Sequence, residues 1–99
     1  MHKISLRRLA HENLLLWKQY SYQYYEQVMR ALQDLENNGF KASSMKRLTS
    51  SSAIFRKRAG RVRILFTFAD EVFHIWIIDL EKDPKKDYAR WIRYVVQHA

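Results

Sequence analysis

The sequence predicts a single α+β domain over residues 1–99, with an N-terminal strand, a helix or helix pair, an antiparallel sheet of three to four strands and a C-terminal helix. Apolar residues recur at helical spacing in the first 38 residues and again near the C-terminus. Between these regions, residues 53–80 are rich in β-branched and aromatic side chains. Only two Gly and one Pro interrupt the chain, and 47% of it is apolar, which suffices for one hydrophobic core.

The N-terminal half is predicted to be a short strand followed by helix. Residues 2–7 have the composition of a short strand, and apolar side chains at helical spacing then indicate helix within residues 9–38. Ser21 is a candidate N-cap, so this stretch is either one helix or two. Asn37-Asn38-Gly39 is expected to end the helix, because Gly adopts the left-handed C-terminal conformation without strain.

The C-terminal half is predicted to be three strands and a helix. Residues 40–52 are polar and serine-rich, which indicates a loop with a possible extended piece at 45–48. The predicted strands are residues 53–59, 62–69 and 72–80. Asp83-Pro84 is typical of an N-cap followed by proline in the first helical position. The final helix would pack through an apolar stripe of Tyr88, Trp91, Ile92 and Val95.

A two-residue loop at Gly60-Arg61 fixes the register of the first predicted hairpin, placing Arg58 opposite Arg63 and Lys57 opposite Ile64. Alternation then separates the two faces of the sheet. The face expected to pack against helices carries Phe55, Val62, Ile64, Phe66 and Phe68, joined by Phe73, Ile75 and Ile77 if the next turn is Asp70-Glu71. The other face carries Arg56, Arg58, Arg63, Leu65, Thr67, His74 and Trp76.

The charge balance favours an anionic partner. Lys and Arg number 18 against 10 Asp and Glu, a net charge of +8, so nucleic acid, an acidic protein or an anionic membrane surface are candidates. Facing like charges at Arg58 and Arg63 cost a few tenths to about 1 kcal/mol, which favours a bound phosphate over a merely solvated basic face. The absence of cysteine excludes disulfides and thiolate chemistry and fits a cytoplasmic protein. No apolar run approaches a membrane span, and no secretory signal is expected.

Residues 55–63 carry the pattern aromatic-Arg-x-Arg-x-Gly-x-x-Arg, followed by an apolar strand, a third strand and a basic segment with Lys82, Lys85, Lys86 and Tyr88. This arrangement resembles the RelE/ParE superfamily of bacterial toxins from type II toxin–antitoxin systems. The resemblance covers most of the chain in element order and is specific across about residues 45–90.

The resemblance implies a ribosome-dependent endoribonuclease that inhibits translation without metal or cofactor. In such toxins the 2′-hydroxyl attacks the adjacent phosphorus of messenger RNA, leaving a cyclic phosphate and a free 5′-hydroxyl. It implies catalytic roles for Arg56 and Arg58 beside the scissile phosphate, Arg63 on the phosphorane, Lys82 at the leaving oxygen and Tyr88 on a base or the nucleophile. Expected RNA-binding residues are Lys57, Arg61, Lys85, Lys86 and Trp76.

The pattern also departs from the family. Ile54 stands where some members have a further basic residue, and Lys82 replaces the usual arginine. No glutamate or histidine occupies the base position of other branches, which leaves a lysine, Lys57 or Lys82, as the candidate base. Two alternatives therefore stay open: a ParE-like inhibitor of DNA gyrase, and a noncatalytic RNA- or protein-binding member. Expected partners are an acidic antitoxin, the ribosome and messenger RNA, with no membrane and no small-molecule cofactor.

Overall fold

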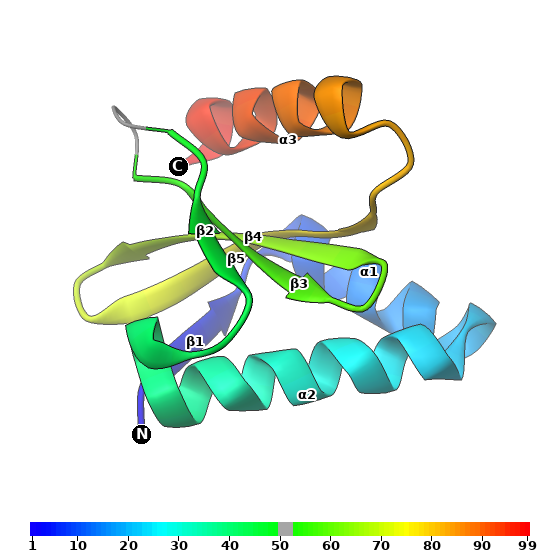
Figure 1. Cartoon of the computed structure of the whole chain (residues 1–99), viewed down its shortest axis with the longest axis horizontal. Coiled ribbons are helices and arrows are strands. Elements are labelled where there is room, and N and C mark those ends of the chain that lie inside the picture. Colours follow the sequence, from blue (N-terminus) through cyan, green and yellow to red (C-terminus); the bar gives the residue numbers. More distant parts are fainter. Residues whose placement is uncertain (50–52) are drawn as a thin grey trace.

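Five strands form one mixed sheet in the order β1-β5-β4-β3-β2, with α1 and α2 on one face and α3 on the other (Figure 1). The computed structural model describes residues 1–49 and 53–99. The strands are β1 (Lys3–Leu6), β2 (Met45–Arg47), β3 (Phe55–Ala59), β4 (Val62–Ala69) and β5 (Val72–Leu80). The helices are α1 (Arg8–Tyr20), α2 (Tyr22–Asn38) and α3 (Pro84–His98), with a 3₁₀ turn at Gly39–Lys41.

The α+β class and the order of elements are confirmed, and the sheet is larger than expected. It has five strands rather than three to four, because the extended piece near 45–48 becomes β2 and the N-terminal segment becomes β1. β1 lies parallel to β5, with Lys3 beside Val72, so the sheet is not purely antiparallel. The predicted loop includes residues 50–52, which lie outside the described residues.

A break at Ser21 makes the helical stretch two helices. Ser21 has extended backbone angles, φ −152° and ψ 90°, and its Oγ accepts a hydrogen bond from the N–H of Tyr24 at 3.5 Å. Gly39 ends α2 with φ +59°, and a Cβ there would lie 2.6 Å from the His2 ring. Both the predicted N-cap and the predicted glycine stop are confirmed.

The hairpin register is confirmed at every predicted pair, including Arg58 opposite Arg63 and Lys57 opposite Ile64. Gly60 has φ +62°, as a two-residue loop of this kind requires. The second turn is also at the expected place, although Asp70 and Glu71 adopt φ +53° and +64°, which non-glycine residues rarely adopt.

An irregularity between Leu65 and Phe66 shifts the pairing of β4 with β5, so that Leu65 faces Ile77 and Phe66 faces Ile75. The extra residue on β5 reverses the alternation beyond it. Ile77 was expected on the face that packs against α1 and α2, but it lies on the α3 face, and Ile78 takes its place. That prediction is wrong because hydrophobic alternation gives no sign of a bulge when neighbouring residues are all apolar.

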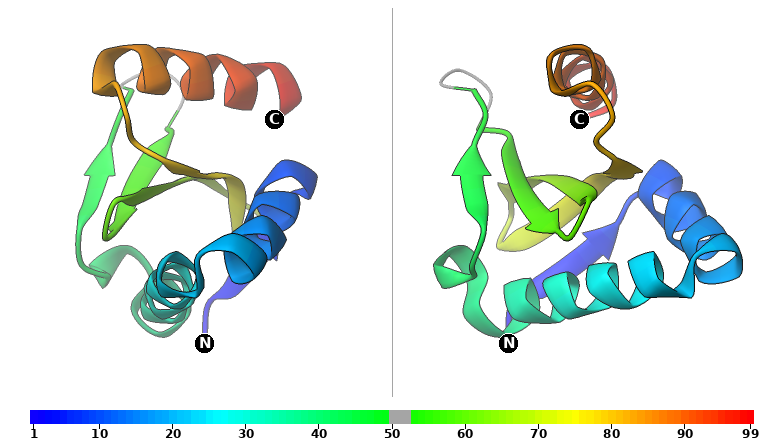
Figure 2. Two further views of the ribbon diagram at one scale, coloured as in Figure 1. Left: turned by 90° about the vertical axis from the view of Figure 1, so that its right-hand side faces the viewer. Right: turned by 45° about the vertical axis from the view of Figure 1, so that its right-hand side comes forward.

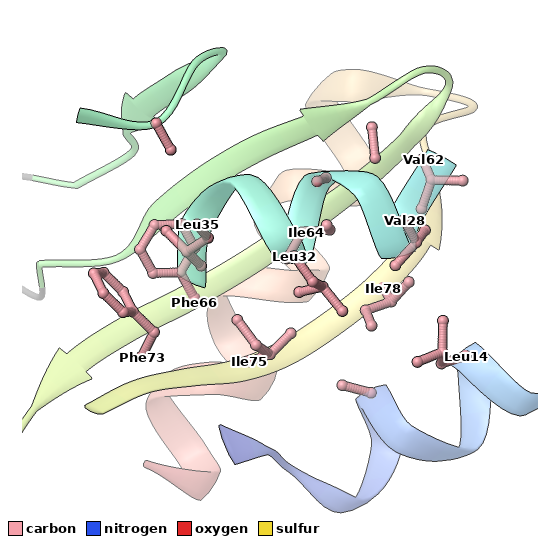
Figure 3. Close-up of a cluster of buried hydrophobic side chains, with 14 residues drawn as sticks. Leu14, Val28, Leu32, Leu35, Val62, Ile64, Phe66, Phe73, Ile75 and Ile78 are labelled. Carbon is pink, nitrogen blue, oxygen red and sulfur yellow. The ribbon is translucent and has the colours of Figure 1, made fainter. Parts of the chain in front are cut away.

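Each face of the sheet has its own core. The larger one lies against α1 and α2 and includes the residues labelled in Figure 3: Leu14, Val28, Leu32, Leu35, Val62, Ile64, Phe66, Phe73, Ile75 and Ile78. The smaller one lies under α3 and contains Ile54, Leu65, Trp76, Ile77, Trp91 and Val95. Figure 2 shows α3 on the side of the sheet away from α2. The α3 helix therefore covers part of the face that carries the arginines.

α3 begins as expected. The Asp83 side chain accepts a hydrogen bond from the N–H of Lys86, and Pro84 occupies the first helical position. Among the described residues, no helix combines the length and the apolar character that a bilayer crossing requires.

Candidate functional site

Exposed cations gather where the β3–β4 hairpin meets the start of α3. The N–H of Glu81 donates to the carbonyl oxygen of Arg61 at 3.3 Å, which holds the hairpin turn against the segment that leads into α3. We call the exposed side chains Arg58, Arg61, Lys82, Lys85 and Lys86 the basic rim. The rim comprises all the solvent-exposed residues among the site residues predicted from sequence.

Lys46 extends the basic surface and was not among the predicted residues. It lies opposite Arg56 in the β2–β3 ladder and is exposed. Pairing places its side chain on the same face of the sheet as Arg56. The extended piece predicted at 45–48 was the available signal, but its register could not be read because only three residues pair.

Arg63 lies beneath the rim with only 9% of its surface exposed. Its guanidinium donates to Glu81 Oε2 at 2.9 Å and to the carbonyl oxygens of Gly60 at 2.7 Å and Val62 at 3.2 Å. Arg63 is therefore neutralised by a carboxylate and directed at the hairpin turn. A phosphate bound between Arg58 and Arg63, as expected from the sequence, would compete with the Glu81 carboxylate for Arg63. The hairpin register identified the residue that faces Arg63 but not this partner.

Arg56 and Tyr88 form the rest of the buried layer under the rim. Arg56 is 9% exposed, and the Tyr88 hydroxyl lies within reach of Arg56 and Glu81 without a hydrogen bond of good geometry to either. Burial raises the pKa of the Tyr88 phenol above its ordinary value; the Arg56 guanidinium opposes the rise, and the Glu81 carboxylate adds to it. The hydroxyl is thus protonated at neutral pH. The Tyr88 ring packs edge-on against Trp91, with centroids 5.2 Å apart.

Unsatisfied polar atoms concentrate in this layer. Among the described residues, the buried side-chain atoms without a hydrogen-bond partner are Arg56 Nε, Arg63 Nε, Tyr88 Oη, Trp91 Nε1 and, away from the site, Gln27 Oε1. Leaving a buried donor unsatisfied costs about 1–3 kcal/mol. Four of these groups lie on the α3 side of the sheet, beneath the basic rim.

Asp87 fixes the backbone from which Lys82 extends. Its Oδ2 accepts from the N–H groups of Lys82 at 2.7 Å and Asp83 at 2.9 Å. These two hydrogen bonds, ahead of the neighbouring Arg90, lower the pKa of Asp87 below its ordinary value. The carboxylate therefore stays ionised at neutral pH and orders the turn, while the Lys82 side chain remains exposed.

Lys57 lies on the opposite face and is only 1% exposed. Its Nζ donates to Asp34 Oδ2 at 2.7 Å and to the carbonyl oxygen of Ser43. Lys57 is the largest cause of a strongly lowered pKa at Asp34, followed by the hydrogen bond from Asn38. The predictions of Lys57 as an RNA-binding residue and as the general base are contradicted, because a buried, ion-paired ammonium reaches neither RNA nor a 2′-hydroxyl.

Trp76 lies on the expected face but is not part of the rim. It is 7% exposed, and its Nε1 donates to Thr67 Oγ1 at 2.8 Å. The Arg7 guanidinium carbon lies 4.9 Å from the ring centroid. Because the ring is packed in the α3 core, it is not exposed beside the cations of the rim, where an RNA-binding Trp76 was expected.

Comparisons with known proteins find similarity only at the level of structure. No family model matches the sequence, and no curated protein sequence matches it. The structure of the YoeB dimer from Staphylococcus aureus aligns with a TM-score of 0.66 at 17% identity, covering 82% of this chain and 98% of YoeB.

Two further solved structures agree. A YoeB/ParE toxin from Agrobacterium tumefaciens aligns with a TM-score of 0.70 at 9% identity, covering 81% of this chain and 99% of that toxin. A YoeB–YefM toxin–antitoxin complex from S. aureus aligns with a TM-score of 0.67 at 16% identity, covering 83% of this chain and 99% of the matched chain. At such identities similarity defines the fold, and the chain therefore has the RelE-like fold of the YoeB and YoeB/ParE toxins.

Proposed function

We propose that this protein is the toxin of a toxin–antitoxin module and cleaves messenger RNA on the ribosome without a metal, thereby inhibiting translation. The observation that carries the proposal is the group of exposed cations in the basic rim, which lies over the buried arginines Arg56 and Arg63. The likeness to YoeB structures supports the toxin class. An RNA phosphate supplies negative charge and hydrogen-bond acceptors to the exposed cations of the rim.

The reaction forms a bond between the 2′-oxygen and phosphorus and breaks the bond from phosphorus to the 5′-oxygen. Negative charge grows on the pentavalent phosphorane, and fixed cations beside it lower the barrier. In this proposal Arg58 contacts the scissile phosphate from the rim, and Arg56 stabilises it from the buried layer. Arg63 acts as a positioning residue, because its guanidinium is committed to Glu81 and two carbonyl oxygens.

Two protons move during this step. We assign the 2′-hydroxyl proton to the Glu81 carboxylate, which lies within reach of Tyr88 and is held by Arg63. The leaving 5′-oxygen takes a proton from Lys82, whose backbone Asp87 fixes. Tyr88, protonated at neutral pH, orients the nucleophile through its hydroxyl. Glu81 was not among the residues expected from the sequence.

The experiment is cleavage of ribosome-bound messenger RNA by purified protein, mapped by primer extension with analysis of the new ends. We expect cyclic phosphate and 5′-hydroxyl ends, with Arg58→Ala and Glu81→Gln each lowering the rate by about 10²-fold or more. Arg30→Ala is the matched control, because Arg30 is an exposed arginine on α2, which packs on the other face of the sheet. Intact messenger RNA would contradict the enzymatic proposal. Arg58-dependent RNA binding without any reaction would favour the noncatalytic alternative.

Inhibition of DNA gyrase is the second candidate. The neutralisation of Arg63 by Glu81 favours it, because this pair removes one cation from the phosphate site. One similar structure is also a YoeB/ParE toxin. A supercoiling assay separates the two functions: gyrase inhibited at micromolar protein supports this candidate, and unchanged supercoiling removes it.

An acidic antitoxin is the partner we propose for the free toxin. The basic rim is exposed and complementary to an acidic, disordered segment that folds on binding. The S. aureus YoeB of similar structure was solved in complex with YefM. Co-expression with the product of the adjacent gene should yield a complex that Arg58→Ala and Lys85→Ala weaken. Recovery of the chain alone, without growth arrest on expression, would contradict the toxin proposal.

A further inference from the structure

A hollow on the α3 side lies at the other end of that helix from Tyr88. It is a cavity of about 420 Å³ between the start of α1 and the end of α3. Its walls include Arg7, Arg8 and Glu12 from around the start of α1, Trp76 from β5, and Tyr94 and His98 from α3. None of these residues except Trp76 was expected at a functional site, and none belongs to the basic rim.

The cations of this cavity are unequally neutralised. Arg8 Nε lies 3.2 Å from Glu12 Oε1, so these two side chains offset one another. Arg7 has no carboxylate partner among the described residues, and its guanidinium rests over the Trp76 ring at 4.9 Å. The Arg7 backbone N–H donates to the carbonyl oxygen of Ile75 at 2.9 Å, which anchors the residue to β5. The cavity therefore offers one positioned guanidinium to an anion.

Flat rings form another wall. His98 stacks on Tyr94 with ring centroids 4.0 Å apart and an interplanar angle of 23°. The His98 Nδ1 lies 2.8 Å from the carbonyl oxygen of Tyr94, which can only accept, so Nδ1 donates in this contact. The last turn of α3 is thus held by a ring stack and a hydrogen bond, and its rings form a surface suited to a planar group.

We propose that this cavity is a second subsite for single-stranded RNA, holding one nucleotide with its phosphate on Arg7 and its base against the Tyr94–His98 stack. This inference rests on the proposed function and extends it away from the scissile phosphate. Tyr88 and His98 are ten residues apart on α3, about 15 Å at 1.5 Å per residue. One RNA strand running along α3 therefore reaches both the rim and the cavity.

The Tyr94–His98 ring stack favours RNA over an acidic polypeptide as the occupant of this cavity. An acidic segment uses the arginines alone, whereas a nucleotide uses both a cation and a stacking surface. The volume also falls within the range of small-ligand cavities, roughly 300–1,000 Å³. Stacking on a ring is tolerant of base identity, so the subsite should hold RNA without strong sequence preference.

Two measurements on the full chain test the inference. In the first, ¹⁵N-labelled protein is titrated with adenosine monophosphate; the Trp76 indole N–H signal should shift in wild type and stay fixed in Arg7→Gln. In the second, binding of a labelled octa-adenylate is followed by fluorescence anisotropy at one salt concentration. Arg7→Gln should weaken binding about tenfold. Lys18→Gln, the same loss of charge at the far end of α1, should change it less than twofold.

Three results would overturn the subsite. The first is an equal effect of Lys18→Gln and Arg7→Gln, which indicates net charge alone. The second is an unmoved Trp76 signal in wild type. The third is Arg7-dependent binding of hexaglutamate without binding of adenosine monophosphate, which assigns the cavity to an acidic polypeptide. Failure here is distinguishable from failure of the proposed function, because cleavage that depends on Arg58 stands even if this cavity stays empty.

Discussion

Strand β3 buries a cation on each face of the sheet, and the two faces hold them differently. Lys57, toward α2, gives its ammonium group to Asp34 and to the Ser43 carbonyl oxygen. Arg56, toward α3, keeps a buried Nε without any partner among the described residues. Burial of a charge is therefore no mark of function by itself. The α3 face differs from the α2 face in its incomplete hydrogen bonding, whereas Lys57 belongs to a structural ion pair.

The largest loss of stability should come from breaking the ion pair of Lys57 with Asp34 on the α2 face. Lys57→Met leaves Asp34 without its buried partner, and we expect the free energy of unfolding to fall by about 3 kcal/mol. This is the low end of the usual range, because Asp34 keeps partial exposure and hydrogen bonds from Asn38 and Ser43. Urea denaturation measures it, with the exposed Lys46→Met as control. A loss below about 0.5 kcal/mol, as for a surface change, would contradict the pairing.

Acid should weaken the same ion pair and so lower the stability of the fold. The pKa of Asp34 is lower in the folded chain than its ordinary value of about 3.9, so its contribution is fully present above that value and is lost as pH falls. Stability measured by urea denaturation should therefore decline from about pH 5 downward. Asp34→Asn should flatten that part of the profile, whereas Asp70→Asn in the exposed turn should leave its slope unchanged. A parallel decline in both variants would contradict the assignment.

A smaller gain is expected in the β4–β5 turn, which unlike the β3–β4 turn contains no glycine. Glu71 has φ +64°, a conformation that glycine adopts without strain. Glu71→Gly should therefore raise the free energy of unfolding by about 1 kcal/mol. The thermal midpoint measures this change. Gly60→Ala, at φ +62° and against Gln27, should lower the midpoint. A lower midpoint for Glu71→Gly would show that its side chain stabilises the turn.

The smallest change in stability should come from Arg56, the neighbour of Lys57 in sequence. Arg56→Met removes an unsatisfied buried group and keeps an apolar chain, so we expect stability within about 1 kcal/mol of wild type. Cleavage of ribosome-bound RNA should nevertheless fall by about 10²-fold or more. If Arg56→Met lost as much stability as Lys57→Met, the distinction between the two faces of the sheet would be contradicted.

The sequence allowed prediction of most local structure but of only part of the site. The Gly60-Arg61 loop set the register, so the face of each arginine followed from alternation alone. The ion-pair partners of the arginines could not be predicted in this way, because Glu81 approaches Arg63 only through the β4–β5 pairing. The cover of α3 over Leu65 and Trp76 was missed for a related reason. A stripe of apolar residues predicts that a helix packs, but not which face of the sheet receives it.

The parallel pairing of β1 with β5 has a consequence for synthesis. Lys3 lies beside Val72, so the chain must close a loop of roughly 70 residues before this edge of the sheet exists. Contacts so distant in sequence slow folding. During translation β1 leaves the ribosome before β5, so it stays unpaired until β5 has been made. Completion of the sheet, and with it the anchoring of Arg7 to β5, therefore comes only after β5 has emerged.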